Sequence, residues 1–216
     1  MKKYAWLIAL LFAANTAFAE TTPLDASIEK LQHDWATANY QTPEKDKEAV
    51  FKKLSEQAHQ VSAGNPGRAE PLIWEAIILS GYAKVKGLFG DASVAEKARD
   101  LLFGAEKLNP KALNGSVYTT LGSLHYKVPG WPVGFGDKKK AREYLEKALQ
   151  FNPDGIDPNY FYADFLLDRG EYAKALEYFK KALNAPARPG REDADAGRKA
   201  DIQEGIKHAE KKLGIR

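Results

Sequence analysis

The chain contains no cysteine among its 216 residues. Without thiols it can form no disulfide, thiolate metal site or cysteine nucleophile, and it lacks the residue that carries a lipoprotein anchor. Long apolar runs are also scarce, because no stretch after the first twenty residues is long enough to span a bilayer. Basic and acidic residues nearly balance, at 32 and 29. The charge therefore predicts no nucleic-acid-binding surface.

The first residues are typical of a secretory signal peptide. Lys2 and Lys3 supply the positive start, residues 4–14 are apolar, and Ala17-Phe18-Ala19 has the small-x-small pattern of a cleavage site. We expect residues 1–19 to be a signal peptide cleaved after Ala19, which predicts a periplasmic mature protein. An uncleaved N-terminal anchor is the alternative interpretation.

An internal repeat organises the rest of the chain. Asn-Pro pairs recur with their prolines at positions 66, 110 and 153, spaced 44 and 43 residues apart, and Pro186 follows as a fourth stop. Before each stop, small and large apolar residues recur at steps of four and three, as in Ala141, Leu145 and Ala148. These steps place them on one face of a helix. A second apolar segment precedes each such helix, so we predict helix–turn–helix units that stack into a superhelix.

The order of residues in these units resembles the tetratricopeptide repeat (TPR) consensus. Ala163, Ala175, Phe179 and Ala182 follow its small-small-aromatic-small order, and Ala141 lies one 34-residue period before Ala175. The resemblance is strongest over residues 114–187. It implies an all-α fold: an α-solenoid of about four TPR-like helix pairs with extended inter-helix loops and a C-terminal capping helix.

We divide the mature chain accordingly. Residues 20–66 are expected to form a divergent N-terminal helix pair, residues 67–190 the TPR-like repeats, and residues 191–216 the capping helix. The long periods indicate insertions at residues 87–91 and 129–137. Both insertions end in Phe-Gly-Asp, and the aspartate is a natural N-cap for the helix that follows. The segment 126–137 resembles exported TPR proteins of the TRAP-transporter T-component type.

The resemblance also implies a binding surface, because the first helices of TPR units line the concave side. The matching positions, with Leu79 and Asp168 beside them, are Glu75, Tyr82, Thr119, Ser123, Tyr126, Lys127, Tyr160 and Asp164. Mixed aromatic and polar residues are typical of a binding groove. A solvated face with chance aromatics is the alternative.

Trp131 and Phe135 are large aromatic residues in the insertion 129–137, which is rich in proline and glycine. They fold back to lock the insertion onto the helices, or they form a lid over a ligand or partner. Under both interpretations we expect the Trp131 ring to be at least partly buried.

Signs of catalysis or metal binding are weak. His33 and His59 have no third ligand at a suitable spacing, and residues 154–157 and 193–197 do not complete a calcium loop. No serine lies in a nucleophile elbow and no phosphate-binding glycine loop follows a strand. We therefore predict no catalytic residue, no metal and no cofactor, and do not expect an enzyme.

The sequence thus favours a periplasmic TPR interaction or adaptor module that binds a protein or peptide partner on its concave face. A transporter-associated binding protein is one candidate partner, and no membrane span is expected after signal cleavage. The alternative is a small-ligand-binding accessory protein of a substrate transport system, in which the aromatic residues would line an enclosed pocket.

Signal processing gives the first prediction. The exported protein should begin at Glu20 and remain in the aqueous fraction, which intact-mass measurement and fractionation will show. Recovery of Met1 in the membrane fraction would instead establish an uncleaved anchor.

Overall fold

The computed structural model describes residues 22–87 and 92–215. The predicted signal peptide (1–19) and the Phe89-Gly90-Asp91 part of the first insertion lie outside these residues. Within the described ranges the chain is helical and no helix is long and apolar enough to cross a bilayer. The helices are α1 (Pro23–Ala36), α2 (Glu44–Ala63), α3 (Ala69–Lys86), α4 (Ser93–Leu108), α5 (Ala112–Lys127), α6 (Lys138–Phe151), α7 (Ile156–Asp168), α8 (Tyr172–Leu183) and α9 (Glu192–Leu213), with a π-helical turn, η1 (Thr37–Gln41), after α1.

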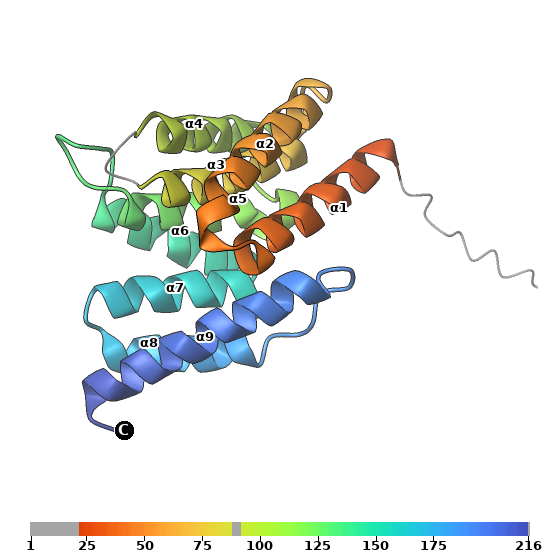
Figure 1. Cartoon of the computed structure of the whole chain (residues 1–216). Coiled ribbons are helices and arrows are strands. Elements are labelled where there is room, and N and C mark those ends of the chain that lie inside the picture. The colour runs from red at the N-terminus through yellow and green to blue at the C-terminus, as the bar shows by residue number, and fades with distance from the viewer. Residues whose placement is uncertain (1–21, 88–91, 216) are drawn as a thin grey trace, which may run out of the picture.

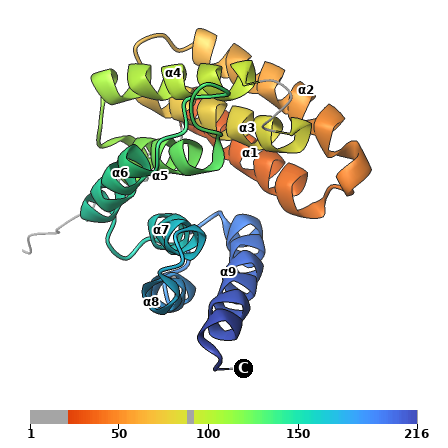
Figure 2. The same cartoon turned by 90° about the vertical axis from the view of Figure 1, so that its left-hand side faces the viewer.

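The helices form two layers, as the solenoid prediction requires. Helices α3, α5 and α7 make an inner layer, and α2, α4, α6 and α8 pack outside it (Figure 1). The outer helices α2, α4 and α6 each contact the inner helix that follows, and α8 contacts the capping helix α9, so the units stack in sequence order. Figure 2 shows the curvature of the stack, with α1 and α9 on its inner side. The expected all-α solenoid with a capping helix is confirmed.

Local sequence signals set the helix ends. Asn109 and Asn152 are the C-caps of α4 and α6, directly before the prolines that prevent the helices from continuing. Asp137 caps α6, because its carboxylate accepts hydrogen bonds from the backbone N–H groups of Lys139 and Lys140 at 2.9 and 3.1 Å. The expected capping role of the aspartate in the second insertion is therefore confirmed.

Paired helices approach closely where a small residue faces a large one. A Cβ atom added at Gly122 of α5 would lie 2.5 Å from Leu145 of α6, too close for any real contact. Gly205 of α9 faces Phe179 of α8 in the same way, at 2.4 Å. Ala182 is fully buried in α8. Side-chain size at these positions thus determines how near the helix axes can lie.

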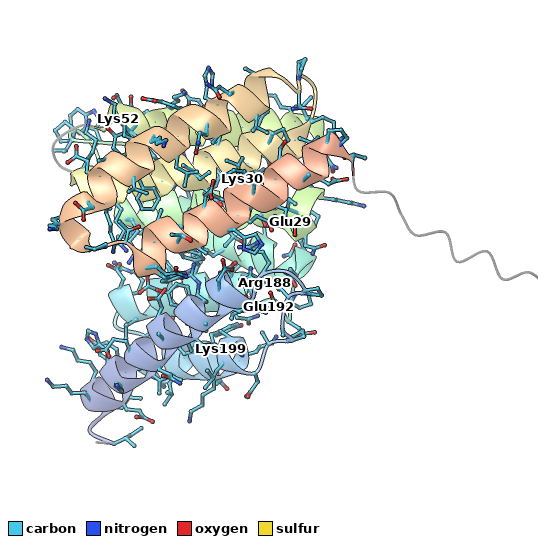
Figure 3. The ribbon with its side chains drawn as sticks, turned by 45° about the vertical axis from the view of Figure 1, so that its right-hand side comes forward. Glu29, Lys30, Lys52, Arg188, Glu192 and Lys199 are labelled. Atoms are coloured by element: carbon cyan, nitrogen blue, oxygen red, sulfur yellow. The ribbon has the colours of Figure 1, made fainter. Side chains whose placement is uncertain are left out.

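The N-terminal helices α1 and α2 contact each other, and both also contact other parts of the fold. Helix α2 packs mainly on α3, whereas α1 lies against α3 and also against α9, at the other end of the chain. Figure 3 shows α1, with Glu29 and Lys30 labelled, beside the start of α9 and the labelled Arg188 and Glu192. In a solenoid each unit normally contacts only its neighbours. Here the helices at the two ends of the chain, α1 and α9, meet.

Ala182 provides a test of the close helix contact. Ala182→Leu should overpack a fully buried site in α8 and destabilise the protein by about 1–3 kcal/mol. Ala173→Leu, at an exposed position of the same helix, is the matched control and should leave the melting temperature nearly unchanged. Equal melting temperatures for both variants would show that Ala182 is not at a close contact.

Candidate partner-binding surface

Tyr126, Lys127 and Asp164 form one cluster where α5 meets α7. The Tyr126 hydroxyl donates a hydrogen bond to the Asp164 carboxylate at 2.6 Å, and the Lys127 ammonium lies 2.7 Å from the same oxygen. Burial, reinforced by the Asp164 charge, holds the pKa of Tyr126 well above its ordinary value. Tyr126 is buried, Asp164 is half-buried and Lys127 is exposed, so a partner can reach the lysine and part of the aspartate.

A hollow of about 230 Å³ lies beside this cluster, between α7, α8 and α9. Tyr160 and Asp164 line it from α7, and Asp201, Glu204 and His208 line it from α9. Phe179 closes its floor next to Gly205. Two residues that the repeat pattern assigned to the concave side, Tyr160 and Asp164, therefore do meet at a surface hollow.

A network of opposite charges holds the start of α7 against α9. Asp157 accepts hydrogen bonds from Arg188 at 2.6 Å and from Arg198 at 2.9 Å. Arg188 also bonds Asp195, and Arg198 bonds Asp201. These contacts join the first turn of α7, the linker after α8 and the capping helix.

The ionisation of this network follows from its partners. Burial alone would raise the pKa of Asp157, but the guanidinium groups of Arg198 and Arg188 outweigh it and hold that pKa far below its ordinary value. Burial likewise raises the pKa of Tyr160, against the opposing effect of the Arg198 guanidinium, which lies 4.2 Å from the ring centroid. Asp157 is therefore a carboxylate at neutral pH.

Contacts between the chain ends cover part of the concave face. The Tyr40 hydroxyl donates to Asp201 at 3.1 Å, and its ring lies where a side chain at Gly197 would stand, 2.3 Å from the added Cβ. His33 of α1 pairs with Asp193 of α9 at 2.9 Å. The expected open groove is thus narrowed by α1 and η1, and the accessible part lies between α7 and α9.

Glu75, which the repeat pattern placed in the groove, is fully buried and faces the outer helices. Its carboxylate accepts a short hydrogen bond from Ser62, and His59 of α2 and Lys97 of α4 lie 3.1 and 3.0 Å from it. A fully buried carboxylate with these partners is not accessible for direct contact with a binding partner. The repeat register gives the position of Glu75 along α3 but not the side of the helix on which its carboxylate lies. His33 and His59 each pair with a different carboxylate.

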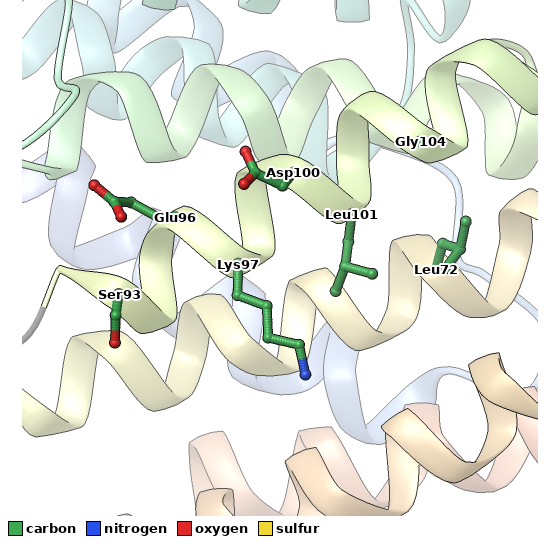
Figure 4. A pocket seen from close by; sticks show the side chains of 7 residues that line it. All are labelled: Leu72, Ser93, Glu96, Lys97, Asp100, Leu101 and Gly104. Atoms are coloured by element: carbon green, nitrogen blue, oxygen red, sulfur yellow. The ribbon is translucent and has the colours of Figure 1, made fainter.

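Lys97 also lines an open hollow of about 610 Å³ on the outer face of α4, together with Leu72 and Leu101. Figure 4 shows Lys97 reaching toward α3, while Glu96 and Asp100 point elsewhere. Lys97 already pairs with Glu75. The other charged side chains that line this hollow are Glu96 and Asp100 of α4, beside the apolar Leu72 and Leu101.

The remaining predicted groove residues differ in accessibility. Tyr82 and Ser123 are half-buried, and Thr119 is buried together with Leu79. Asp168 is exposed and pairs with Lys138 at 2.5 Å. Tyr82 and Ser123 are thus partly accessible, whereas Thr119 packs inside.

The loop 128–137, between α5 and α6, corrects one expectation. Trp131 is 90% exposed, so the ring neither locks the loop nor lies in a closed pocket. Phe135 has the locking role: it packs edge-on against His125 at 5.4 Å between ring centroids, with the Arg99 guanidinium 4.6 Å from its own centroid. Arg99 lies on α4, so Phe135 packs toward α4, whereas the Tyr126 hydroxyl faces α7. Lys138, directly after the loop, donates to the Tyr126 carbonyl at 3.0 Å and joins the end of the loop to this cluster.

Sequence reasoning missed the Asp157–Arg188–Arg198 network. The only available signal was Asp157 in the first turn of a helix with proline next to it, which indicates capping and not a charge network. Its two arginines lie 31 and 41 residues away, outside any helical periodicity. Among the described residues no three histidine or acidic side chains gather in a way that would hold a metal ion.

Comparison with known proteins supports the repeat. A family model described as Tetratricopeptide repeat matches residues 134–191, which span α6, α7 and α8. Residues 134–191 are a tetratricopeptide repeat. The TPR resemblance read from the sequence is thereby confirmed, while the finer likeness to TRAP T-components stays a prediction. No curated protein matches the chain in sequence.

The chain is also similar to solved structures of MamA and pilF. A crystal structure of MamA is 18% identical with a TM-score of 0.43, covering 79% of this chain and 93% of its own. The AMB-1 form of MamA is 16% identical with a TM-score of 0.45, covering 88% and 99%. The Pseudomonas aeruginosa pilF protein is 18% identical with a TM-score of 0.35, covering 88% of each chain. Scores this low do not bear on function.

The charge network predicts that substitution of Asp157 lowers the free energy of unfolding by an amount that depends on pH. Asp157→Asn should leave Arg188 and Arg198 without their shared carboxylate and destabilise the protein by about 3 kcal/mol at pH 7. Because the folded-state pKa of Asp157 is lowered, its contribution is complete above the unfolded value of about 3.9 and is lost as pH falls further. The gap between wild type and variant should therefore shrink below about pH 4.

Asp154→Asn is the matched control, because the ion pair of Asp154 with Lys181, at 3.5 Å, joins two exposed side chains and should contribute little to stability. Urea unfolding of the three proteins between pH 3 and 7 measures both effects. Equal free energies of unfolding for the two variants would mean that the network does not stabilise the fold.

Proposed function

We propose that the protein acts in the periplasm as a TPR-type interaction module, binding a protein or peptide partner at the hollow between α7 and α9. The observation that carries this proposal is the position of Tyr160 and Asp164. The repeat register assigned both to the concave side, and both line this hollow. The hollow adjoins the exposed Lys127, so a partner meets aromatic, acidic and basic groups together.

The contact chemistry suits a polypeptide. Glu204 and His208 are exposed along α9, and the half-buried Tyr160 and Leu167 supply apolar surface across from them. A rim of polar side chains around a small apolar centre is the usual anatomy of a protein interface. The signal-peptide pattern of residues 1–19 supports the periplasmic location.

The small-ligand alternative receives less support. It predicted aromatic residues around an enclosed pocket, but Trp131 faces solvent. The hollow at α7 and α9 measures about 230 Å³, below the 300 Å³ or so at which ligand pockets begin. The hollow of about 610 Å³ at α4 is open and has no aromatic residue in its lining. We therefore favour a protein or peptide partner.

A blocking substitution tests the site without assuming the charge of the partner. Glu204→Trp should fill the hollow from an exposed position and reduce partner capture about tenfold, because it removes the space for an anchoring side chain. The measurement is affinity capture from periplasmic extract with the protein beginning at Glu20, followed by quantitative mass spectrometry.

Gln203→Trp supplies the control, because Gln203 is exposed on α9 next to Glu204 but does not line the hollow. Both variants should melt like wild type. If the same proteins are captured in equal amounts by both, the partner does not bind between α7 and α9.

A further inference from the structure

The loop 128–137 has a closely specified shape. Backbone N–H groups of Val133 and Gly134 both donate to the Gly130 carbonyl, at 3.1 and 3.2 Å, and that of Gly136 donates to Pro129 at 2.9 Å. A Cβ at Gly136 would lie 2.0 Å from the Val128 carbonyl oxygen. Glycine is therefore required there by the close backbone approach.

This fixed loop turns two apolar side chains outward. Phe135 is held inside by His125 and Arg99, whereas Trp131 is 90% exposed and Val133 is 56% exposed. The loop projects beyond the neighbouring helix ends (Figure 1). Because the brace at Phe135 and the backbone hydrogen bonds hold the loop, its backbone has little conformational freedom left to lose on binding.

Positive charge accompanies the two apolar residues. Residues 127–142 contain five basic residues and one acidic residue. Three of the five are paired: Lys127 with Asp164, Lys138 with Asp168, and Arg142 with Glu171. Lys139 and Lys140 are exposed in the first turn of α6, and within the described ranges neither forms an ion pair. Asp137 offsets part of their charge, since it interacts with Lys140, so the surface next to the loop keeps a small net positive charge.

A protein partner fits this surface poorly. A stable protein interface buries about 800 Å² on each side around a packed centre. Trp131 and Val133 stand on a projecting tip, and neither residue lines one of the two hollows described above. A lipid headgroup layer needs no complementary pocket, tryptophan is enriched at the membrane–water interface, and lysines are attracted to anionic lipids.

We propose that the loop 128–137 docks the protein on an anionic membrane surface, with Trp131 and Val133 entering the headgroup region and Lys139 and Lys140 binding lipid phosphates. The interaction goes beyond the proposed partner binding and does not depend on it.

Vesicle binding tests this docking directly. The protein beginning at Glu20 contains every described helix and excludes the apolar leader, which would bind lipid by itself. It should co-sediment with vesicles of phosphatidylglycerol and phosphatidylcholine, and much less with phosphatidylcholine alone. Raising the salt to about 0.5 M should weaken binding, since screening then acts within a few ångströms.

Tryptophan fluorescence identifies the inserted group. After residue 19 the chain has Trp35, Trp74 and Trp131, and only Trp131 is almost fully exposed. Anionic vesicles should shift the wild-type emission to shorter wavelength and protect it from iodide. Trp131→Ala should abolish both changes and lower vesicle binding about tenfold, while its melting temperature stays at the wild-type value because the ring packs on nothing.

Charge reversal provides the second arm. Lys139→Glu with Lys140→Glu should lower binding to anionic vesicles about tenfold. Lys211→Glu with Lys212→Glu makes the same charge change at exposed lysines near the end of α9 and should bind like wild type. The proposal is overturned by equal vesicle binding of wild type and Trp131→Ala, by equal loss in both lysine pairs, or by no vesicle binding. Loss of a captured protein by Trp131→Ala without lipid binding would instead make the loop a protein contact.

Discussion

The close approach of neighbouring helices at small residues is the constraint on which the architecture depends. Gly122 against Leu145 and Gly205 against Phe179 show the same arrangement at different levels of the stack. In each pair one helix has a glycine at the contact, and a large side chain of the neighbouring helix occupies the space that a Cβ atom would need. The fully buried Ala182 extends the pattern within α8. Since each interface sets the distance and tilt of the next helix, the curvature of the inner layer follows from these contacts.

The curvature in turn brings the chain ends together. Tyr40 reaches Asp201, and His33 reaches Asp193, over about 160 residues of sequence. The Asp157–Arg198 pair then joins the last repeat to the same capping helix. These polar contacts are orientation-dependent, so they fix α9 against α1 and α7 more specifically than apolar packing alone. What remains open of the concave side is the hollow between α7 and α9.

The two candidate surfaces therefore differ in origin. The hollow is formed by the stacking of helices, because the residues that line it come from α7, α8 and α9. The loop 128–137 is an addition to the repeat, shaped by its own backbone contacts and braced at Phe135.

The sequence by itself determined the helices, their order and the small residues between them, because capping and apolar periodicity act within one or two helical turns. The Asn-Pro stops, the Asp137 cap and the spacing of Ala175, Phe179 and Ala182 are all local signals. Tertiary structure alone decided which way the side chains of the candidate site turn. Glu75 pairs with His59 and Lys97 of the outer helices. Trp131 is exposed to solvent, whereas Phe135 packs against the helices. Asp157 binds two arginines that lie 31 and 41 residues further along the chain. Such choices depend on the superhelical path, which brings together residues that share no local pattern.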